Sequence, residues 1–351
     1  MIKLLIVDDS AVVRAMLSEL FKNDERFEVS GLAENGERAV ELNEKFSPDL
    51  IIMDVNMPVM NGIDATKKIL SVSNPAVVMF TTEDTVARAF KDGLKAGALE
   101  VIKKPDLAVM TTRMLTDFLE NIFLIGEKQK KNREESEKKQ KEKDKKVVQN
   151  TAVFTSPKVY RLLTIGASTG GPAAIQKLLS GLGKDFPLPV LITQHIDSVF
   201  DTHFVSWLNE TSPLTTELAK NSTIPEKGHV YVAPAGFHLT VTPVNDSIQK
   251  CRIVLNTEPP VHFLRPAVDK LFSSAAQTFG KKVISVLLTG MGRDGAEGSR
   301  ELFEKDALTI AEDESSCVVY GMPKAAVDCG CIKQVLPLDS IADYLRNVTG
   351  V

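Results

Sequence analysis

Residues 163–172 read L-T-I-G-A-S-T-G-G-P and join a predicted strand to a predicted helix. Three glycines surround one serine, Ser168, and Pro172 follows near the first helical position, where its missing N–H costs little. Strand, tight turn and helix form the repeating unit of a parallel α/β sheet. The chemistry of this turn therefore decides how the C-terminal part of the chain is interpreted.

Three interpretations of the turn compete. A Walker-type phosphate loop requires Lys-Ser or Lys-Thr after its last glycine, and Pro172 stands there instead, so this interpretation is excluded. A dinucleotide loop, G-x-G-x-x-G, is matched only in a degenerate form because Ser168 replaces its middle glycine, and this alternative stays open. The third is the nucleophile turn G-x-S-x-G, which Gly166 to Gly170 match.

A serine nucleophile needs a base, and the base needs an acid that orients it. Of the five histidines, His195 ends an apolar run at 189–193, which places it at the sheet edge expected for Ser168. Asp294 follows another apolar run in the loop T-G-M-G-R-D-G and is our candidate acid. A helix cap is the alternative role for Asp294.

In the N-terminal part, five apolar runs alternate with helical patterns, which predicts a parallel sheet with right-handed crossovers. Polar side chains follow these runs: Asp8, Asp9, Asp54, Thr81 and Lys104. Three carboxylates at one edge suit a hard cation such as Mg²⁺, and a carboxylate can also accept a phosphoryl group. Any one of these residues alone could be a helix cap.

A charged segment divides the chain. Of the 20 residues from 127 to 146, 16 are charged and none is apolar, so the segment has nothing to bury and predicts a spacer that is partly helical. The expected organisation is a domain at 1–125, a linker at 126–157 and a second domain at 158–351.

Composition sets further limits. With 43% hydrophobic residues and a net charge of -4, the chain can form two cores, and its charge gives no reason to expect a nucleic-acid partner. We found no signal peptide and no run near the ~20 apolar residues of a membrane span, so we expect a cytoplasmic protein without membrane insertion. The four cysteines, of which Cys329 and Cys331 are closest, are predicted to be buried, reduced thiols.

Residues 1 to about 122 resemble the receiver domain of two-component response regulators, a five-stranded parallel, flavodoxin-like fold. The resemblance implies that Asp54 accepts the phosphoryl group from a chemotaxis histidine kinase and that Asp8, Asp9 and Asp54 hold Mg²⁺. It also implies switch roles for Thr81 and Lys104. Val101 departs from the family, which often has an aromatic residue three positions before the lysine.

Four segments of the second part resemble the CheB-type chemotaxis methylesterase family: G-A-S-T-G-G-P, Q-H, L-T-G-M-G-R-D-G and A-E-D-E-S-S-C-V-V-Y-G-M-P-K-A-A. The resemblance implies a doubly wound α/β esterase domain with a mainly parallel sheet, and a nucleophile, base and acid at Ser168, His195 and Asp294. It places Thr169 and Met291 at the active site.

The same resemblance implies the substrates: methyl-accepting chemotaxis receptors, whose glutamyl methyl esters are hydrolysed and certain glutamines deamidated, with no cofactor for the esterase step. His262 departs from the family, which usually has an asparagine at that position. We expect the unphosphorylated receiver to cover the esterase site. Two rivals remain: a regulator with a non-catalytic output domain, and a dinucleotide-dependent enzyme.

Overall fold

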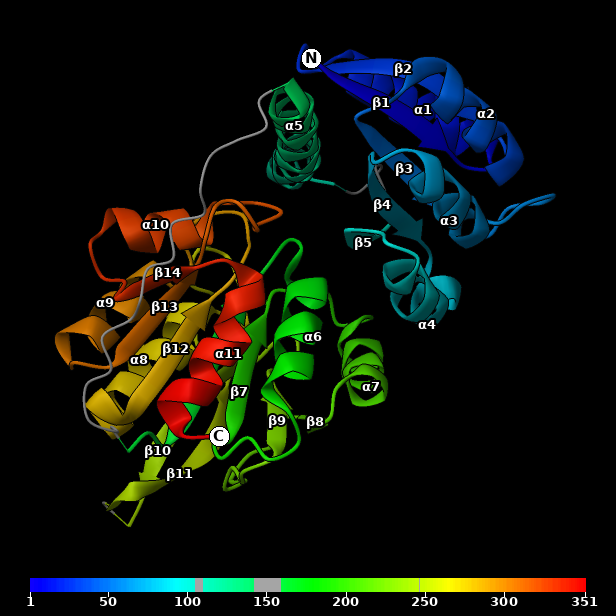
Figure 1. The fold of residues 1–351 in the computed structure, drawn as a ribbon. Helices are drawn as coiled ribbons and strands as arrows, with labels where there is room; N and C mark the ends of the chain where they lie inside the picture. The colour runs from blue at the N-terminus through cyan, green and yellow to red at the C-terminus, as the bar shows by residue number, and fades with distance from the viewer. Residues whose placement is uncertain (105–109, 142–158, 246) are drawn as a thin grey trace. The chain divides into compact units, whose positions relative to one another are not determined.

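Two parallel sheets organise the chain, one in each of two units that span Met1–Thr155 and Ser156–Val351 (Figure 1). The structure, a computed structural model, describes residues 1–104, 110–141, 159–245 and 247–351. Most of the predicted linker, from residue 142 onward, lies outside these ranges, so the predicted division at 125 and 157 stays a prediction. Within the described ranges, no helix is both long and apolar enough to cross a bilayer.

The first unit contains a five-stranded parallel sheet in the order β2-β1-β3-β4-β5, which confirms the predicted flavodoxin-like receiver fold. The strand that ends at Asp54 and the strand that follows it in the chain are wholly buried, as expected when helices cover both faces of a parallel sheet. The strands are β1 (Ile2–Val7), β2 (Phe27–Ala33), β3 (Leu50–Asp54), β4 (Ala76–Thr81) and β5 (Glu100–Lys103).

Side-chain caps begin the first three helices of this unit. The side chains of Ser10, Asn35 and Asn61 each accept a hydrogen bond from a backbone N–H of the first helical turn. The helical segments are α1 (Ala11–Lys22), α2 (Gly36–Phe46), α3 (Gly62–Val72), η1 (Glu83–Thr85), α4 (Val86–Arg88), η2 (Ala89–Gly93) and α5 (Thr112–Lys141).

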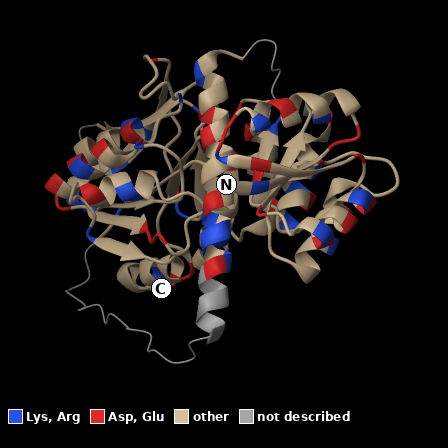
Figure 2. Ribbon diagram, turned by 90° about the horizontal axis from the view of Figure 1, so that it is seen from above, with Lys and Arg blue, Asp and Glu red and all other residues tan. Residues whose placement is uncertain are grey.

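Helix α5 continues well into the predicted linker. Its first half buries Ile122 and Ile125, whereas residues of both charge signs follow one another along its second half (Figure 2). Arg133 Nη2 lies 2.5 Å from Asp49 Oδ1, and Lys130 Nζ donates to the Met1 carbonyl at 3.0 Å. The beginning of the charged segment is therefore helical and contacts other parts of the first unit.

The second unit contains a seven-stranded parallel sheet in the order β14-β13-β12-β6-β7-β9-β8. It confirms the predicted α/β fold with a mainly parallel sheet. Strands β6, β7 and β12, which carry the site, are fully buried. The seven strands are β6 (Leu162–Ala167), β7 (Val190–Gln194), β8 (Thr215–Leu218), β9 (His229–Val232), β12 (Val283–Leu287), β13 (Leu308–Glu312) and β14 (Gln334–Leu336).

A two-stranded antiparallel hairpin, which we had not predicted, accompanies this sheet: β10 (His238–Val244) and β11 (Ser247–Asn256). It packs on α8, where Val241 N donates to Ser274 Oγ at 3.1 Å. His238 begins β10 and is fully buried. The helical segments are α6 (Gly171–Leu182), α7 (Asp201–Thr211), α8 (Val268–Phe279), η3 (Gly280–Lys282), α9 (Ala296–Glu304), α10 (Met322–Asp328) and α11 (Leu338–Thr349).

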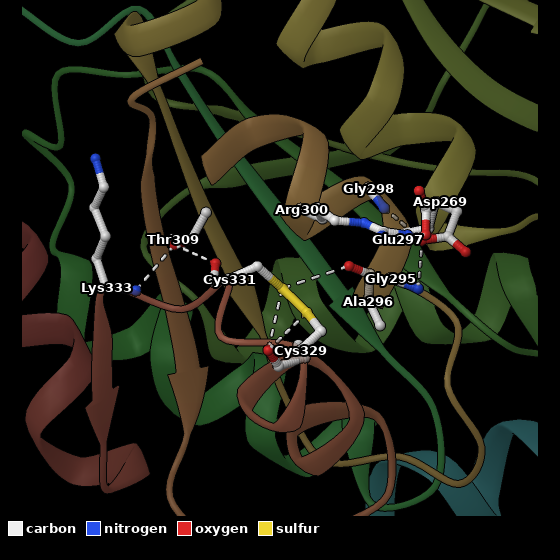
Figure 3. Close-up of a disulfide and its surroundings, with 11 residues drawn as sticks. Asp269, Gly295, Ala296, Glu297, Gly298, Arg300, Thr309, Cys329, Cys331 and Lys333 are labelled. Atoms are coloured by element: carbon white, nitrogen blue, oxygen red, sulfur yellow. Dashed lines mark hydrogen bonds and ion pairs between the residues drawn. A yellow bond between two sulfur atoms is a disulfide. The ribbon is translucent and has the colours of Figure 1, made fainter. Parts of the chain in front are cut away.

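The cysteine prediction was half wrong. Cys251 and Cys317 are buried free thiols, as expected, but Cys329 and Cys331 form a disulfide (Figure 3). Gly330 between them adopts a left-handed φ of 70°, which folds the chain back so that the two Cα atoms lie 5.5 Å apart. Figure 3 shows this disulfide beside Ala296 at the start of α9, where Cys331 Sγ lies 3.7 Å from the Ala296 carbonyl oxygen.

Candidate active site

The serine turn lies between β6 and α6. Ser168 is half-buried, its backbone N–H donates to the Thr289 carbonyl at 3.0 Å, and its own carbonyl accepts from Gly171 N at 2.8 Å. The left-handed residue of the turn is Gly170, with a φ of 74°, and not the serine. The glycine therefore supplies the bend, and Ser168 stands just before the N-terminus of a 12-residue helix.

Protein atoms occupy the space beside the glycines of this turn. A Cβ added at Gly166 would lie 2.3 Å from Val268 Cγ1, one at Gly170 would lie 2.6 Å from Val318 Cβ, and one at Gly171 would lie 2.0 Å from Gln194 Oε1. In a dinucleotide loop the glycines make room for the pyrophosphate and for close helix packing. Here they make room for neighbouring side chains, so the dinucleotide interpretation loses its support.

His195 lies at the same edge of the sheet as Ser168. Strand β7 pairs with β6 so that Gln194 is opposite Ala167, and His195 N donates to the Ala167 carbonyl at 3.1 Å. The buried amide of Gln194 donates from Nε2 to the carbonyls of both Ser168 and His195, each at 2.9 Å. Our reading of the sequence did not single out Gln194, although a polar residue at the end of an apolar strand was a usable signal.

Asp294 meets His195 directly. Its Oδ2 lies 2.7 Å from His195 Nε2, and Asp294 is almost completely buried. Burial would raise the pKa of Asp294, but the hydrogen bond and charge of His195 outweigh it, and the pKa lies below its usual value. Because Nε2 meets Asp294, Nδ1 is the ring nitrogen that remains for proton transfer, the reverse of the chymotrypsin arrangement.

The loop after β12 closes one side of the site. A Cβ added at Gly290 would lie 2.7 Å from Ser168 Cβ, and Met291, the next residue, is half-buried. Thr289 Oγ1 donates to the Thr169 carbonyl at 2.9 Å. Thr289 N donates at 2.8 Å to Oε2 of Glu312, a fully buried carboxylate that our sequence reasoning missed. Thr169 directly follows Ser168, and Met291 directly follows Gly290, whose backbone lies beside the Ser168 side chain.

The second cluster lies in the first unit, at the ends of β1, β3 and β5. Carboxylate oxygens of Asp8, Asp9 and Asp54 all lie within 4.8 Å of one another. Lys104 Nζ lies 2.7 Å from Asp8 Oδ2 and 2.9 Å from Asp54 Oδ1. Three hard oxygen donors at this spacing are a set that fits Mg²⁺.

Burial and charge act against each other in this cluster. Burial, with a smaller contribution from the Asp8 charge, raises the pKa of Asp54 despite the Lys104 ammonium. Burial would lower the pKa of Lys104, but hydrogen bonds to Asp8 and Asp54 outweigh it and raise that pKa. Thr81 ends β4 and is fully buried; its hydroxyl lies 2.5 Å from Thr85 Oγ1 and donates to the Thr82 carbonyl.

Comparison with known proteins finds a matching family for each of the two units. The profile of the family described as CheB methylesterase matches residues 163–345, which is more than half of the chain. The chain belongs to the CheB methylesterase family. A second profile, the response regulator receiver domain, matches residues 4–114.

Members of the CheB methylesterase family are similar to the chain over nearly its whole length. A protein-glutamate methylesterase/protein-glutamine glutaminase from Paramagnetospirillum magneticum is 40% identical and covers 99% of this chain and 97% of its own length. One from Clostridium acetobutylicum is 36% identical with the same coverage. The solved CheB methylesterase catalytic domain of Thermotoga maritima is 35% identical, has a TM-score of 0.52, and covers 55% of this chain and 99% of its own.

Proposed function

We propose that this chain is a phosphorylation-regulated protein-glutamate methylesterase and protein-glutamine glutaminase that acts on the cytoplasmic parts of chemotaxis receptors. The observation that carries the proposal is the 2.7 Å contact between His195 Nε2 and Asp294 Oδ2 at the sheet edge where the Ser168 turn lies. This is the arrangement of a base held by an acid beside a hydroxyl nucleophile.

The mechanism follows from these three side chains. Ser168 Oγ attacks the ester carbonyl of a receptor glutamyl methyl ester while Nδ1 of His195 takes the serine proton. Asp294 holds the ring and stabilises its positive charge. The α6 N-terminus, whose dipole is positive, favours the negative oxygen of the tetrahedral intermediate.

Collapse of the intermediate breaks the ester bond, and His195 returns the proton to the departing methanol. Water, deprotonated by His195, then attacks the acyl-enzyme and releases the receptor glutamate and Ser168. With a glutamine side chain, ammonia is the leaving group in place of methanol.

The first unit regulates this activity through Asp54, the carboxylate at the end of β3. Asp8, Asp9 and Asp54 would hold Mg²⁺, which when bound offsets the negative charge of a phosphoryl group. Lys104, already in contact with Asp8 and Asp54, is placed to pair with that group once Asp54 carries it. The phosphoryl group would come from a phosphohistidine of a chemotaxis histidine kinase.

The catalytic part of the proposal is tested by labelling. A fluorophosphonate probe is expected to modify Ser168 in the wild-type protein, and Ser168→Ala is expected to lower release of methanol from methylated receptor membranes by at least about a thousandfold. Ser180→Ala, which removes an exposed serine from α6, serves as the matched control and should retain labelling and activity. Undiminished methanol release by Ser168→Ala would show that another group is the nucleophile.

A further inference from the structure

A second buried carboxylate lies beside the acid of the triad. Asp269, the second residue of α8, is only 7% exposed, and its backbone N–H donates to Asp294 Oδ1 at 2.9 Å. The preceding N–H, that of Val268, donates at 2.7 Å to Oδ2 of Asp294, the same oxygen that meets His195. The first turn of α8 therefore fixes both oxygens of the triad acid.

Asp269 in turn accepts hydrogen bonds from the backbone at the start of α9. Its Oδ1 accepts hydrogen bonds from Gly295 N at 2.9 Å and Gly298 N at 2.8 Å, in the first turn of α9 directly after Asp294 (Figure 3). The N-cap residues of the two helices, Ala267 and Gly295, make no side-chain capping hydrogen bond. The Asp294 carboxylate thus caps the N-terminus of α8, and the Asp269 carboxylate caps the N-terminus of α9. Each accepts hydrogen bonds from backbone N–H groups that the N-cap residue of that helix does not bind.

Close packing leaves this pair little freedom to move. A Cβ added at Gly298 would lie 2.5 Å from Phe272 Cβ and 3.0 Å from the Asp269 carbonyl oxygen. Because α8 and α9 meet this closely, the reciprocal caps set where the α9 turn begins and, with it, where the Asp294 carboxylate stands.

We propose that Asp269 is a positioning residue of the esterase, which holds Asp294 so that its Oδ2 meets His195. The proposal rests on the function proposed above, since it assigns a role within the same site. The hydrogen bonds described above join Asp269 to Asp294 and Asp294 to His195, so Asp269 acts on His195 through Asp294.

The second carboxylate oxygen of Asp269, Oδ2, faces a histidine side chain at the surface. Asp269 Oδ2 lies 3.5 Å from Nε2 of His262, whose side chain is 44% exposed. His262 and Phe263 form a two-residue tip, closed by a bridge between Val261 and Leu264, and both have left-handed φ values, of 51° and 68°. Asp269 therefore faces two ionisable side chains, Asp294 on the inner side and His262 on the outer side, and reaches His195 through Asp294.

The charge of Asp269 depends on pH within a useful range. Burial and the neighbouring Asp294 charge raise the pKa of Asp269 to about 6. The charged form, which makes the stronger acceptor for the two α9 N–H groups, is thus present at neutral pH and is lost as the pH falls through about 6. A neutral side chain of the same shape should reproduce the low-pH state at every pH.

Asp269→Asn tests the proposal in the full chain with methylated receptor membranes as substrate. Above pH 7 we expect kcat to fall roughly 10- to 100-fold with KM nearly unchanged, because the residue is buried and a small displacement of catalytic groups has effects of this size. Below pH 6 the ratio of wild-type to variant kcat should approach one. Ser273→Ala is the matched control. It removes a different polar contact between α8 and α9, Ser273 Oγ to Glu301 at 2.7 Å, and should leave the kcat ratio near one throughout.

A surface variant gives an independent readout that does not require a change in the core. The His262 imidazole can present an N–H to Asp269 Oδ2, which favours the charged carboxylate. His262→Asn has a shorter side chain that withdraws this donor, so it should move the midpoint of the wild-type kcat profile to higher pH. Asparagine accepts the left-handed φ at this position with little strain.

The outcomes separate the two proposals. If the wild-type protein releases no methanol, the proposed function fails, whatever Asp269 does. If the wild-type protein is active, three results overturn the role of Asp269: full kcat for Asp269→Asn above pH 7, a loss that is the same from pH 5 to pH 8, or an unchanged pH profile for His262→Asn.

Discussion

Gln194 joins the two backbone segments that carry the proposed nucleophile, Ser168, and the proposed base, His195. Its Nε2 donates to the carbonyls of Ser168 and His195 from a side chain that is 2% exposed. One amide thereby fixes the separation of the two segments more directly than the pairing of their strands alone. Such a residue should influence the reaction without touching the substrate.

Gln194→Leu removes both donors while keeping an apolar side chain of similar size. We expect a loss of about 1–3 kcal/mol in the free energy of unfolding and at least a tenfold fall in kcat, since two buried hydrogen bonds and the serine–histidine spacing are lost. Thermal unfolding and methanol release measure the two effects.

The neighbouring position provides the control for this variant. Thr193 is buried, and its hydroxyl has no hydrogen-bond partner in the described part of the chain. Thr193→Val should therefore leave stability unchanged or raised, with full kcat. Equal losses for the two variants would mean that Gln194 contributes only as a buried residue of that strand.

Glu312 gives a second residue-scale prediction, in which pH is the variable. It is fully buried, and burial raises the pKa of its carboxyl despite hydrogen bonds from Thr289 N and Ser316 Oγ. The folded protein therefore binds the Glu312 proton more tightly than the unfolded chain does. The contribution of Glu312 to the free energy of unfolding falls as the pH rises from the ordinary glutamate pKa through the raised pKa.

Glu312→Gln removes that dependence, because its amide can accept from Thr289 and donate to Ser316. We expect the variant to become more stable relative to wild type as pH is raised from 4 to 8, measured by denaturant unfolding at each pH. Glu304→Gln, at an exposed position in α9, should keep the wild-type dependence. A constant difference between Glu312→Gln and wild type would contradict the burial argument.

At the scale of elements, the start of α3 packs directly on the end of β3. A Cβ added at Gly62 would lie 1.9 Å from the carbonyl oxygen of Asp54 and 2.8 Å from Met53 Cγ. Backbone cannot move aside as the end of a side chain can. The first residue of α3 is thus a glycine because the helix must approach the backbone of Asp54, the proposed phosphorylation site, this closely.

Gly62→Ala should separate α3 from β3 at a cost of about 1–3 kcal/mol and slow phosphorylation of Asp54, because the carboxylate moves with its backbone. Thermal unfolding and incorporation of label from radiolabelled acetyl phosphate test this. In Gly31→Ala the nearest atoms are side-chain ends, Leu5 Cδ1 at 3.1 Å and Leu42 Cδ1 at 3.3 Å, so this control should be nearly neutral. A wild-type phosphorylation rate for Gly62→Ala would refute the close-approach argument.

The same scale explains how much of the fold could be predicted from the sequence. Strands such as β3, β6 and β12 are buried on both faces, so their sequences are continuous apolar runs. The edge strand β8 and the β10–β11 hairpin are partly exposed and lack such runs, and we did not predict them.

The site residues likewise fall into those that a local sequence pattern could predict and those that it could not. Ser168, His195 and Asp294 each follow an apolar strand in sequence, so their positions could be predicted. The role of Asp269 depends on hydrogen bonds to Gly295 and Gly298, which lie 26 and 29 residues away, and on helix packing that no local pattern contains. The disulfide was missed because its formation depends on the left-handed conformation of one glycine.

At the scale of the whole molecule, the proposed phosphorylation site and the proposed esterase site lie in two different units, each with its own parallel sheet. The Thermotoga maritima structure is of a catalytic domain alone, and it covers 55% of this chain. We propose that the receiver restrains the esterase until Asp54 is phosphorylated. An intact two-unit chain is expected to be slow without a phosphodonor for that reason.

The comparison of the full chain with residues 156–351 tests this coupling. We expect the fragment to demethylate receptors about 5- to 150-fold faster than the unphosphorylated chain, the range of typical coupling free energies between sites. Acetyl phosphate with Mg²⁺ should accelerate the full chain but neither the fragment nor Asp54→Asn, which keeps the receiver while removing its acceptor. Equal rates for fragment and full chain, with and without phosphodonor, would show that the two sites work independently. Acceleration of Asp54→Asn by acetyl phosphate would place the phosphorylation elsewhere in the chain.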